Sequence, residues 1–167
     1  PHVELALVVS NRADAYALER AKKAGIRAEY VEKSGFEERL NALLDEEGVG
    51  LIILAGFLRI LSEDFTRRWA GRVINIHPSL IPAFCGAGFY GLHVHEAALS
   101  RGVKVTGATV HFVNEIPDGG EIIAQHAVEV LPGDTPEVLQ RRVMEQAEWI
   151  ILPAAAEAVA EELEGRE

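Results

Sequence analysis

The stretch Arg72–Pro78, RVINIHP, reads as a short apolar strand that ends on two polar side chains and a proline. Residues two apart in a strand point to the same face, so Asn75 and His77 should project together. Pro78 cannot donate a ladder hydrogen bond and holds His77 extended, so we expect the strand to stop there. A lone histidine at a strand end is more often structural, but this combination favours a functional site.

Apolar runs alternate with amphipathic segments on both sides of this stretch. We expect strands over 3–9, 27–31, 49–56 and 72–77, separated by helices over 11–25, 36–48 and 62–71. Asn11 and Ser62 are the expected caps of the first and third of these helices. This alternation predicts an α/β chain with a mostly parallel, twisted sheet and helices on both faces.

The second half of the chain is less regular. A helix over 91–102 should precede two strands, 104–113 and 121–131, and a long helix should follow from residue 134 onward. Either Asp134 or Thr135 is its expected cap, with Pro136 near the first helical position. Pro153 should kink or split this helix, because proline removes a helical hydrogen bond.

Composition excludes several classes of function. The chain has 167 residues, 49% of them hydrophobic, and we expect one domain over 1–167. The net charge is −10 without a basic cluster, so no nucleic-acid partner is expected. No apolar run reaches the roughly 18 residues of a membrane span, so no membrane association is expected. Cys85 is the single cysteine, which favours a reducing, cytoplasmic location.

Two further strand ends carry polar residues. Gly56 is the last residue of the strand over 49–56 and precedes Arg59, while Asp118 lies in the turn sequence PDGG. In open parallel sheets, ligands bind beyond the carboxyl ends of the strands. Taken alone, Arg59 fits a solvated helix start equally well, and Asp118 fits a turn former better. Asp118 gains interest only if it lies near His77, since a carboxylate helps a histidine to hold a proton.

Several motifs together resemble the phosphoribosylglycinamide formyltransferase family of folate-dependent formyltransferases. They are VVSNRADAYALERAKKAGI, LAGFLRIL, NIHPSLIPAF, GATVHFV, DGGEII and GDTPEVLQRRV. The resemblance runs from about residue 5 to Pro153. It implies a Rossmann-like formyltransferase fold, and transfer of a formyl group from 10-formyltetrahydrofolate to the amine of glycinamide ribonucleotide in purine biosynthesis.

The resemblance also implies roles for individual residues. Asn75, His77 and Asp118 would be catalytic: Asn75 and a protonated His77 would donate to the oxyanion, and His77 with Asp118 would exchange protons. The two substrate sites take a larger set: folate would contact Leu58, Arg59, Ile60, Leu61, Lys33, Asn75, Thr109 and Asn114, and the ribonucleotide Gly56, Ile76 and Glu148. The expected partners are therefore these two small molecules, with 10-formyltetrahydrofolate as co-substrate and no metal. A homodimer is possible.

The family opens with a strand and a Gly-Ser-Asn loop whose following helix binds the substrate phosphate. This chain begins without that segment, so we expect the natural chain to be longer by about one βα unit. The loop over 84–91 is longer than in many relatives, and its glycines suggest mobility over the site.

Two alternative functions stay open. One is formyltetrahydrofolate deformylase, a hydrolase that uses the same three residue types. The other is a catalytically silent folate- or nucleotide-binding module, as the chain stands. Methionyl-tRNA formyltransferase is less favoured, because no basic second domain is present to bind RNA.

Overall fold

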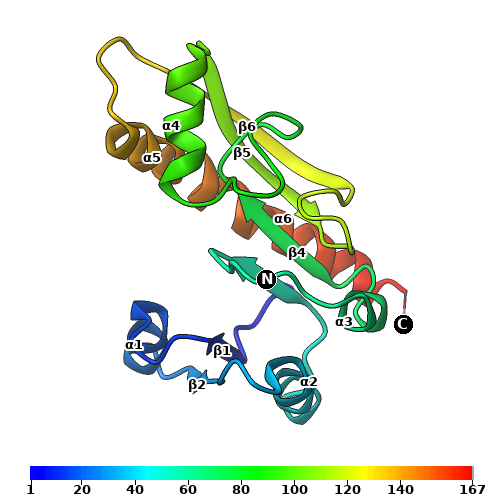
Figure 1. The fold of residues 1–167 in the computed structure, drawn as a ribbon. Coiled ribbons are helices and arrows are strands. Elements are labelled where there is room, and N and C mark those ends of the chain that lie inside the picture. The colour runs from blue at the N-terminus through cyan, green and yellow to red at the C-terminus, as the bar shows by residue number, and fades with distance from the viewer. Residues whose placement is uncertain (167) are drawn as a thin grey trace. The chain divides into compact units, whose positions relative to one another are not determined.

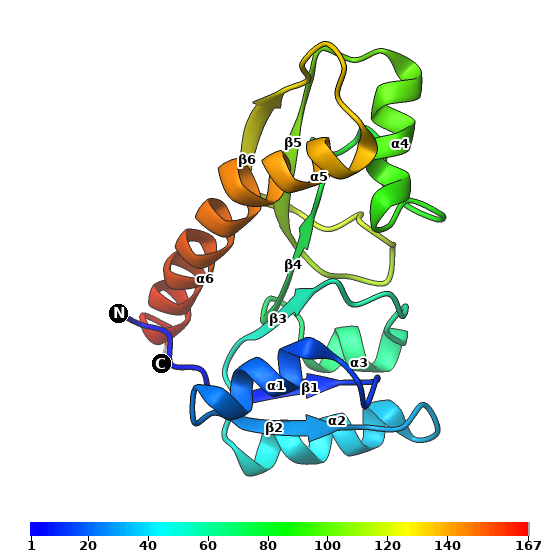
Figure 2. The same ribbon diagram turned by 90° about the vertical axis from the view of Figure 1, so that its left-hand side faces the viewer.

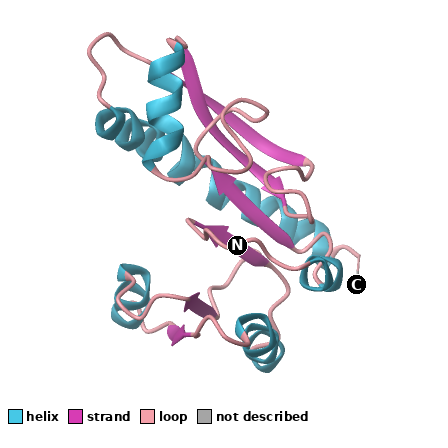
Figure 3. Cartoon of the chain, viewed as in Figure 1, coloured by secondary structure: helices cyan, strands magenta, loops and turns pink. Residues whose placement is uncertain are grey.

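The computed structural model describes residues 1–166, which divide into two compact units (Figures 1 and 3). The first is Pro1–Gly50 and the second begins at Leu51. Helices and strands alternate along the first unit, whereas the second ends in a pair of long strands and a long helical segment. The expectation of a single domain over the whole chain stays a prediction.

The N-terminal unit is a small α/β layer. It contains β1 (Leu7–Ser10), α1 (Tyr16–Lys23), β2 (Arg27–Tyr30) and α2 (Phe36–Glu46), and its two strands pair in parallel. The helices turn their apolar residues inward at helical spacing. Those buried residues are Leu18, Ala21, Phe36, Leu40, Leu43 and Leu44.

The start of this unit differs from the prediction. The strand expected from Val3 begins only at Leu7, and the helix expected to be capped by Asn11 begins at Tyr16 after an N-cap at Ala15. A turn occupies the intervening residues, because the Ala15 N–H donates to the Arg12 carbonyl at 3.2 Å. Asn11 as a cap was therefore wrong, since this turn delays the first helical residue.

The second unit is built on a four-stranded sheet in the order β3-β4-β5-β6. Its strands are β3 (Ile52–Ala55), β4 (Val73–His77), β5 (Val105–Phe112) and β6 (Ile122–Glu129). β3 and β4 are parallel, as predicted, whereas β4–β5 and β5–β6 pair antiparallel. The α/β character therefore holds throughout, and the parallel order ends at β4, because β5 pairs antiparallel with β4 and β6 pairs antiparallel with β5.

The helices of the second unit pack around this sheet. They are α3 (Glu63–Arg68), α4 (Leu92–Arg101), α5 (Pro136–Val143) and α6 (Trp149–Glu164). The helical segment from α5 to α6 lies along β5 and β6, and α4 packs against α5 (Figures 1 and 2). No helix within residues 1–166 is both long and apolar enough to cross a membrane.

The predicted caps of this unit are largely confirmed. The Phe65 N–H donates to the Ser62 hydroxyl at 3.2 Å at the start of α3. Of the two candidates for the long helix, Thr135 is the cap, and its hydroxyl accepts from the Val138 N–H at 3.3 Å.

The irregularity predicted at Pro153 in the C-terminal helix instead lies several residues before this proline. A π-helical segment, Met144–Glu148, separates α5 from α6, and Pro153 lies inside α6 close to its start. The π turn follows α5 without a break and leads directly into α6, which continues through Pro153 to Glu164.

Asp134 has a structural role in place of capping. Its carboxylate binds both terminal nitrogens of the Arg142 guanidinium, at 2.5 and 2.8 Å, and accepts the Leu131 N–H at 2.7 Å. Only 4% of the Asp134 side chain and 15% of the Arg142 side chain are exposed. The hydrogen bonds from Arg142 lower the pKa of Asp134, although burial opposes them.

We expect Asp134→Asn to lower the free energy of unfolding by about 2 kcal/mol at pH 7, measured by urea denaturation, because Arg142 loses its anionic partner. Because folding lowers the pKa of Asp134, this stabilisation is complete above the pKa of the same carboxyl in the unfolded chain, about 4. It is lost as the pH falls through the folded-state value, so the two proteins should converge in acid.

Arg141→Gln is the matched control, because the Arg141–Glu145 pair is exposed and should change stability by less than about 0.5 kcal/mol. Equal stability of Asp134→Asn and the unmodified chain at pH 7 would contradict the assignment.

Candidate active site

The end of β4 presents the two polar residues singled out in the sequence. β4 pairs antiparallel with β5, so Asn75 lies opposite His111 and His77 lies opposite Thr109. His77 is 4% exposed and Asn75 is half-buried. Asn75 and His77 both line one cavity of about 380 Å³, as expected of residues two apart on one strand.

Asp118 comes to the same place from a different segment, the connection between β5 and β6. One carboxylate oxygen, Oδ2, lies 3.7 Å from His77 Nδ1, and the other, Oδ1, lies 3.5 Å from His111 Nε2. The backbone of Asp118 is left-handed, with φ +53°. Asp and Asn adopt this conformation more readily than most residues. The structure therefore brings Asn75, His77 and Asp118 together.

Gly120 makes the Asp118 turn possible. A Cβ atom built on Gly120 would lie 1.6 Å from the carbonyl oxygen of Phe112, so no side chain fits at this position. The Phe112 N–H in turn donates to the Glu121 carbonyl at 2.8 Å and closes the connection. The second glycine of the PDGG sequence is thus required by close backbone approach.

His111 is a member of this cluster that the sequence reasoning missed. It is 2% exposed, and its Nδ1–H donates to the Phe112 carbonyl at 2.7 Å. Its Nε2 lies 3.5 Å from Asp118 Oδ1, to which it donates when protonated, and 3.2 Å from the Asn75 amide nitrogen, from which it accepts when it carries no hydrogen. This contact orients the Asn75 amide. Its second N–H remains available for a ligand in the cavity. Alternation along GATVHFV would have placed His111 on the same face as Thr109.

The environment of Asp118 keeps it ionised. Burial alone raises the pKa of Asp118, but three contacts outweigh it: the His111 imidazole, the Gly86 N–H at 2.8 Å and the nearby His77. The net effect lowers the pKa below the ordinary 3.8. Asp118 is therefore a carboxylate at neutral pH and stabilises positive charge on either histidine.

A third histidine, His95 on α4, is buried close to His77 and behaves differently. Burial, followed by the charge of His77, lowers the pKa of His95 to about 4. His95 is 1% exposed, and neither ring nitrogen has a hydrogen-bond partner within the described residues. His95 therefore stays neutral at physiological pH, so the histidines that interact with the Asp118 carboxylate are His77 and His111.

The cavity collects most of the residues expected at the two substrate sites. Its lining includes the three residues predicted to be catalytic and Gly56, Leu58, Arg59, Ile60, Leu61, Ile76 and Asn114. Leu58 and Ile60 are exposed, at 68% and 75%, and supply apolar surface at the rim. Gly56 has φ +66°, which lets the chain turn sharply after β3. The loop residues Phe89 and Tyr90, to which the sequence reasoning gave no individual role, also belong to the lining.

Three expected site residues lie outside this lining. Thr109 is fully buried, and its hydroxyl donates to the Ser79 carbonyl at 2.7 Å and accepts from the Ile81 N–H at 3.1 Å. Glu148 lies in the π-helical segment, where burial raises its pKa. Lys33 belongs to the N-terminal unit. The substrate contacts expected of these three residues stay predictions.

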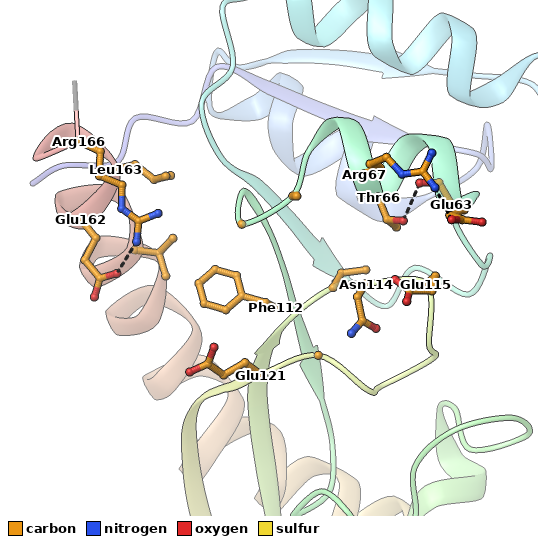
Figure 4. Close-up of a pocket in the computed structure, with 15 residues that line it drawn as sticks. Glu63, Thr66, Arg67, Phe112, Asn114, Glu115, Glu121, Glu162, Leu163 and Arg166 are labelled. Atoms are coloured by element: carbon orange, nitrogen blue, oxygen red, sulfur yellow. Dashed lines mark hydrogen bonds and ion pairs between the residues drawn. The ribbon is translucent and has the colours of Figure 1, made fainter.

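A second cavity of the same unit, about 610 Å³, has a different character (Figure 4). It is lined by α3, the β5–β6 connection and the end of α6. Its arginines are paired locally, Arg67 with Glu63 and Arg166 with Glu162 at 3.9 Å. These ion pairs are exposed, and exposed pairs contribute little binding energy. They differ in this from the buried polar cluster that lines the first cavity.

The chemistry available at the first cavity is proton exchange and stabilisation of negative charge. Asn75 offers an oriented amide donor, His77 an imidazole, and Asp118 a fixed negative charge. Together they suit a reaction in which a carbonyl oxygen becomes an anion while one nitrogen loses a proton and another gains one.

Comparison with known proteins gives consistent matches. A family model described as formyl transferase matches residues 1–155. The chain is 47% identical over 163 residues to the trifunctional purine biosynthetic protein adenosine-3 of Gallus gallus. The match covers 94% of this chain but only 16% of that protein. It is 40% identical over 156 residues to the phosphoribosylglycinamide formyltransferase of Haemophilus influenzae, covering 90% of this chain and 71% of that one.

The solved structure of phosphoribosylglycinamide formyltransferase from Anaplasma phagocytophilum matches with a TM-score of 0.88. The two are 39% identical, and the match covers 96% of this chain and 75% of that one. This likeness confirms the predicted Rossmann-like α/β formyltransferase fold.

We expect His111→Gln to raise the pKa of Asp118, because it removes the strongest of the contacts that lower it. The measurement is a pH titration of the ¹³C carboxyl signal of Asp118. His126→Gln is the matched control, since His126 is exposed on β6. An Asp118 pKa that is the same in both variants would show that His111 does not tune the carboxylate.

Proposed function

Because the chain belongs to the formyl transferase family, we propose that it transfers the formyl group of 10-formyltetrahydrofolate to the amine of glycinamide ribonucleotide. The observation that carries this proposal is the convergence of Asn75, His77 and Asp118 on one cavity. The names of the matched relatives support the choice of substrates.

Asn75 is the proposed donor to the oxyanion. When the amine attacks the formyl carbon, the formyl oxygen gains negative charge in a tetrahedral intermediate. One N–H of the Asn75 amide is held by His111 at 3.2 Å, which directs the other to the cavity without a cost of reorientation. Removing a donor of this kind typically raises a barrier by about 3 kcal/mol.

His77 and Asp118 are proposed to move the proton. The attacking amine nitrogen must lose a proton, and the folate nitrogen that leaves the formyl carbon must gain one. The His77 imidazole accepts and returns this proton, while the ionised Asp118 at 3.7 Å stabilises the imidazolium. The low pKa of Asp118 keeps its charge available throughout.

The proposed folate subsite is the Leu58–Leu61 segment with Asn114. Leu58 and Ile60 give apolar surface for a ring system, and the cavity volume lies in the range of small-molecule sites. Arg59 supplies a cation for an anionic folate tail. Lys33 is a further proposed folate contact, and Thr109 is proposed to act on the folate side only through the Ser79 and Ile81 main chain that its buried hydroxyl holds.

The proposed ribonucleotide side comprises Gly56 and Ile76, with Glu148 as a partner for ribose hydroxyls. We propose that the protein acts in the cytoplasm on these two small molecules, with no metal and no nucleic-acid partner. A homodimer is the proposed assembly to be tested by sedimentation.

The direct test is an assay of full-length protein with 10-formyltetrahydrofolate, with and without glycinamide ribonucleotide. We expect consumption of the folate to depend on the ribonucleotide and to yield one formylated product per turnover. Rapid release of formate in the absence of ribonucleotide would instead identify a deformylase. Binding of folate with neither reaction would identify a silent module.

We expect His77→Ala and Asp118→Asn each to lower kcat at least ~100-fold, because each removes a member of the proton-exchange pair. Circular dichroism should remain unchanged, since His77 is the last residue of β4, Asp118 lies in the β5–β6 connection, and neither belongs to the apolar core.

His93→Ala serves as the control, because His93 is an exposed residue of α4 that pairs with Glu96 at 3.1 Å. Near-normal turnover in either test variant would remove that residue from the proposed trio.

A further inference from the structure

The loop that follows β4 contacts both His77 and Asp118 through its main chain. The carbonyl oxygen of Phe84 lies 2.8 Å from His77 Nε2. Two residues later, the Gly86 N–H donates to Asp118 Oδ2 at 2.8 Å. The same carboxylate oxygen faces His77 Nδ1. A three-residue segment thus touches the imidazole on one side and the carboxylate on the other.

The contact with Phe84 determines where the proton of His77 lies. A carbonyl oxygen can only accept a hydrogen bond, so Nε2 must carry the hydrogen. Nδ1 is then the nitrogen that can change its protonation state. It lies 3.7 Å from Asp118 Oδ2, which is too long for a hydrogen bond, so Nδ1 is not locked to the carboxylate.

The backbone of Phe84 is held in an unfavourable conformation at this point. Its φ is +49°, in the left-handed region that bulky residues rarely adopt. Such strain persists only where the surroundings impose it, and it concentrates at functional sites. Two contacts hold the loop: the buried Ser79 hydroxyl donates to the Ala83 carbonyl at 2.5 Å, and the Phe84 ring packs edge-on against Phe89.

We propose that the main chain of Phe84–Gly86 is the positioning element of the site, an assignment that rests on the proposed function. The Phe84 carbonyl fixes His77 as the Nε2–H tautomer, and the Gly86 amide holds Asp118 opposite Nδ1. Nδ1 therefore takes the proton from the attacking amine and returns it to the departing folate nitrogen. The amine becomes a formamide, and the folate leaves as a secondary amine with no net change of protons.

This division of roles follows the logic of other catalytic histidines. One ring nitrogen is oriented by a fixed partner, which leaves the other to exchange protons. Here the orienting partner is a backbone carbonyl, and the carboxylate stabilises the imidazolium from the working side. His111 and His95, the other histidines near His77, do not take the Phe84 carbonyl, since His111 bonds to Phe112 and neither ring nitrogen of His95 has a hydrogen-bond partner among the described residues.

The test compares Phe84→Pro with Phe84→Gly in the full-length protein. Both variants remove the aromatic ring, but proline requires φ near −65°, whereas glycine accepts +49°. Long-range ¹H–¹⁵N correlation of ¹⁵N-histidine-labelled protein reports the tautomer of His77, and the loss of its signals in His77→Gln assigns them.

We expect unmodified protein and Phe84→Gly to show hydrogen on Nε2 of His77, and Phe84→Pro to show a mixture of tautomers. The kcat of Phe84→Gly should exceed that of Phe84→Pro at least ~10-fold. An Nδ1–H tautomer in the unmodified protein would overturn the inference even if Phe84→Pro did not fold. An Nε2–H tautomer retained in a folded Phe84→Pro would also overturn it.

The proposed function fails separately. If unmodified protein shows no formyl transfer, the reaction is wrong, whereas the tautomer measurement still decides the role of the Phe84 carbonyl.

Discussion

The register between β4 and β5 is the constraint on which the site depends. Antiparallel pairing sets Asn75 opposite His111 and His77 opposite Thr109. Because side chains alternate along a strand, a slip of one residue would send both β4 polar groups to the other face. Apolar residues on the opposite face of the two strands help to prevent that slip, since Ile74 and Val110 are fully buried. Packing of the core thereby determines which groups reach the cavity.

Two connections complete what the sheet begins. The β5–β6 connection delivers Asp118, and the loop after β4 delivers the carbonyl and amide groups of Phe84 and Gly86. Both connections include a residue with positive φ that is not glycine, Phe84 and Asp118. Strain at both positions fits a site in which loops are held by the polar groups they orient. The sheet supplies position, and the loops supply charge and direction.

Sequence patterns carried the prediction a long way for elements that depend on local periodicity. The apolar run that ends at His77 and the caps Ser62 and Thr135 were all readable, because alternation and capping are local. His111 was missed because its role depends on pairing with another strand. Asn11 was misassigned because a local turn competes with the helix start. No local pattern reveals that Asp118 reaches His77, since that proximity arises from the sheet and two separate connections.

The hydroxyl of Thr109 shows how narrowly such a structure limits natural variation. It gives one hydrogen bond, to Ser79, and receives two, from Ile81 and from the Gln125 amide at 3.1 Å. A hydroxyl has no further capacity, so every lone pair and hydrogen is in use. Valine has the same shape but would remove a hydrogen-bond partner from three groups at once. Serine keeps this hydroxyl and valine does not, so the hydrogen-bond pattern admits serine at this position and disfavours valine.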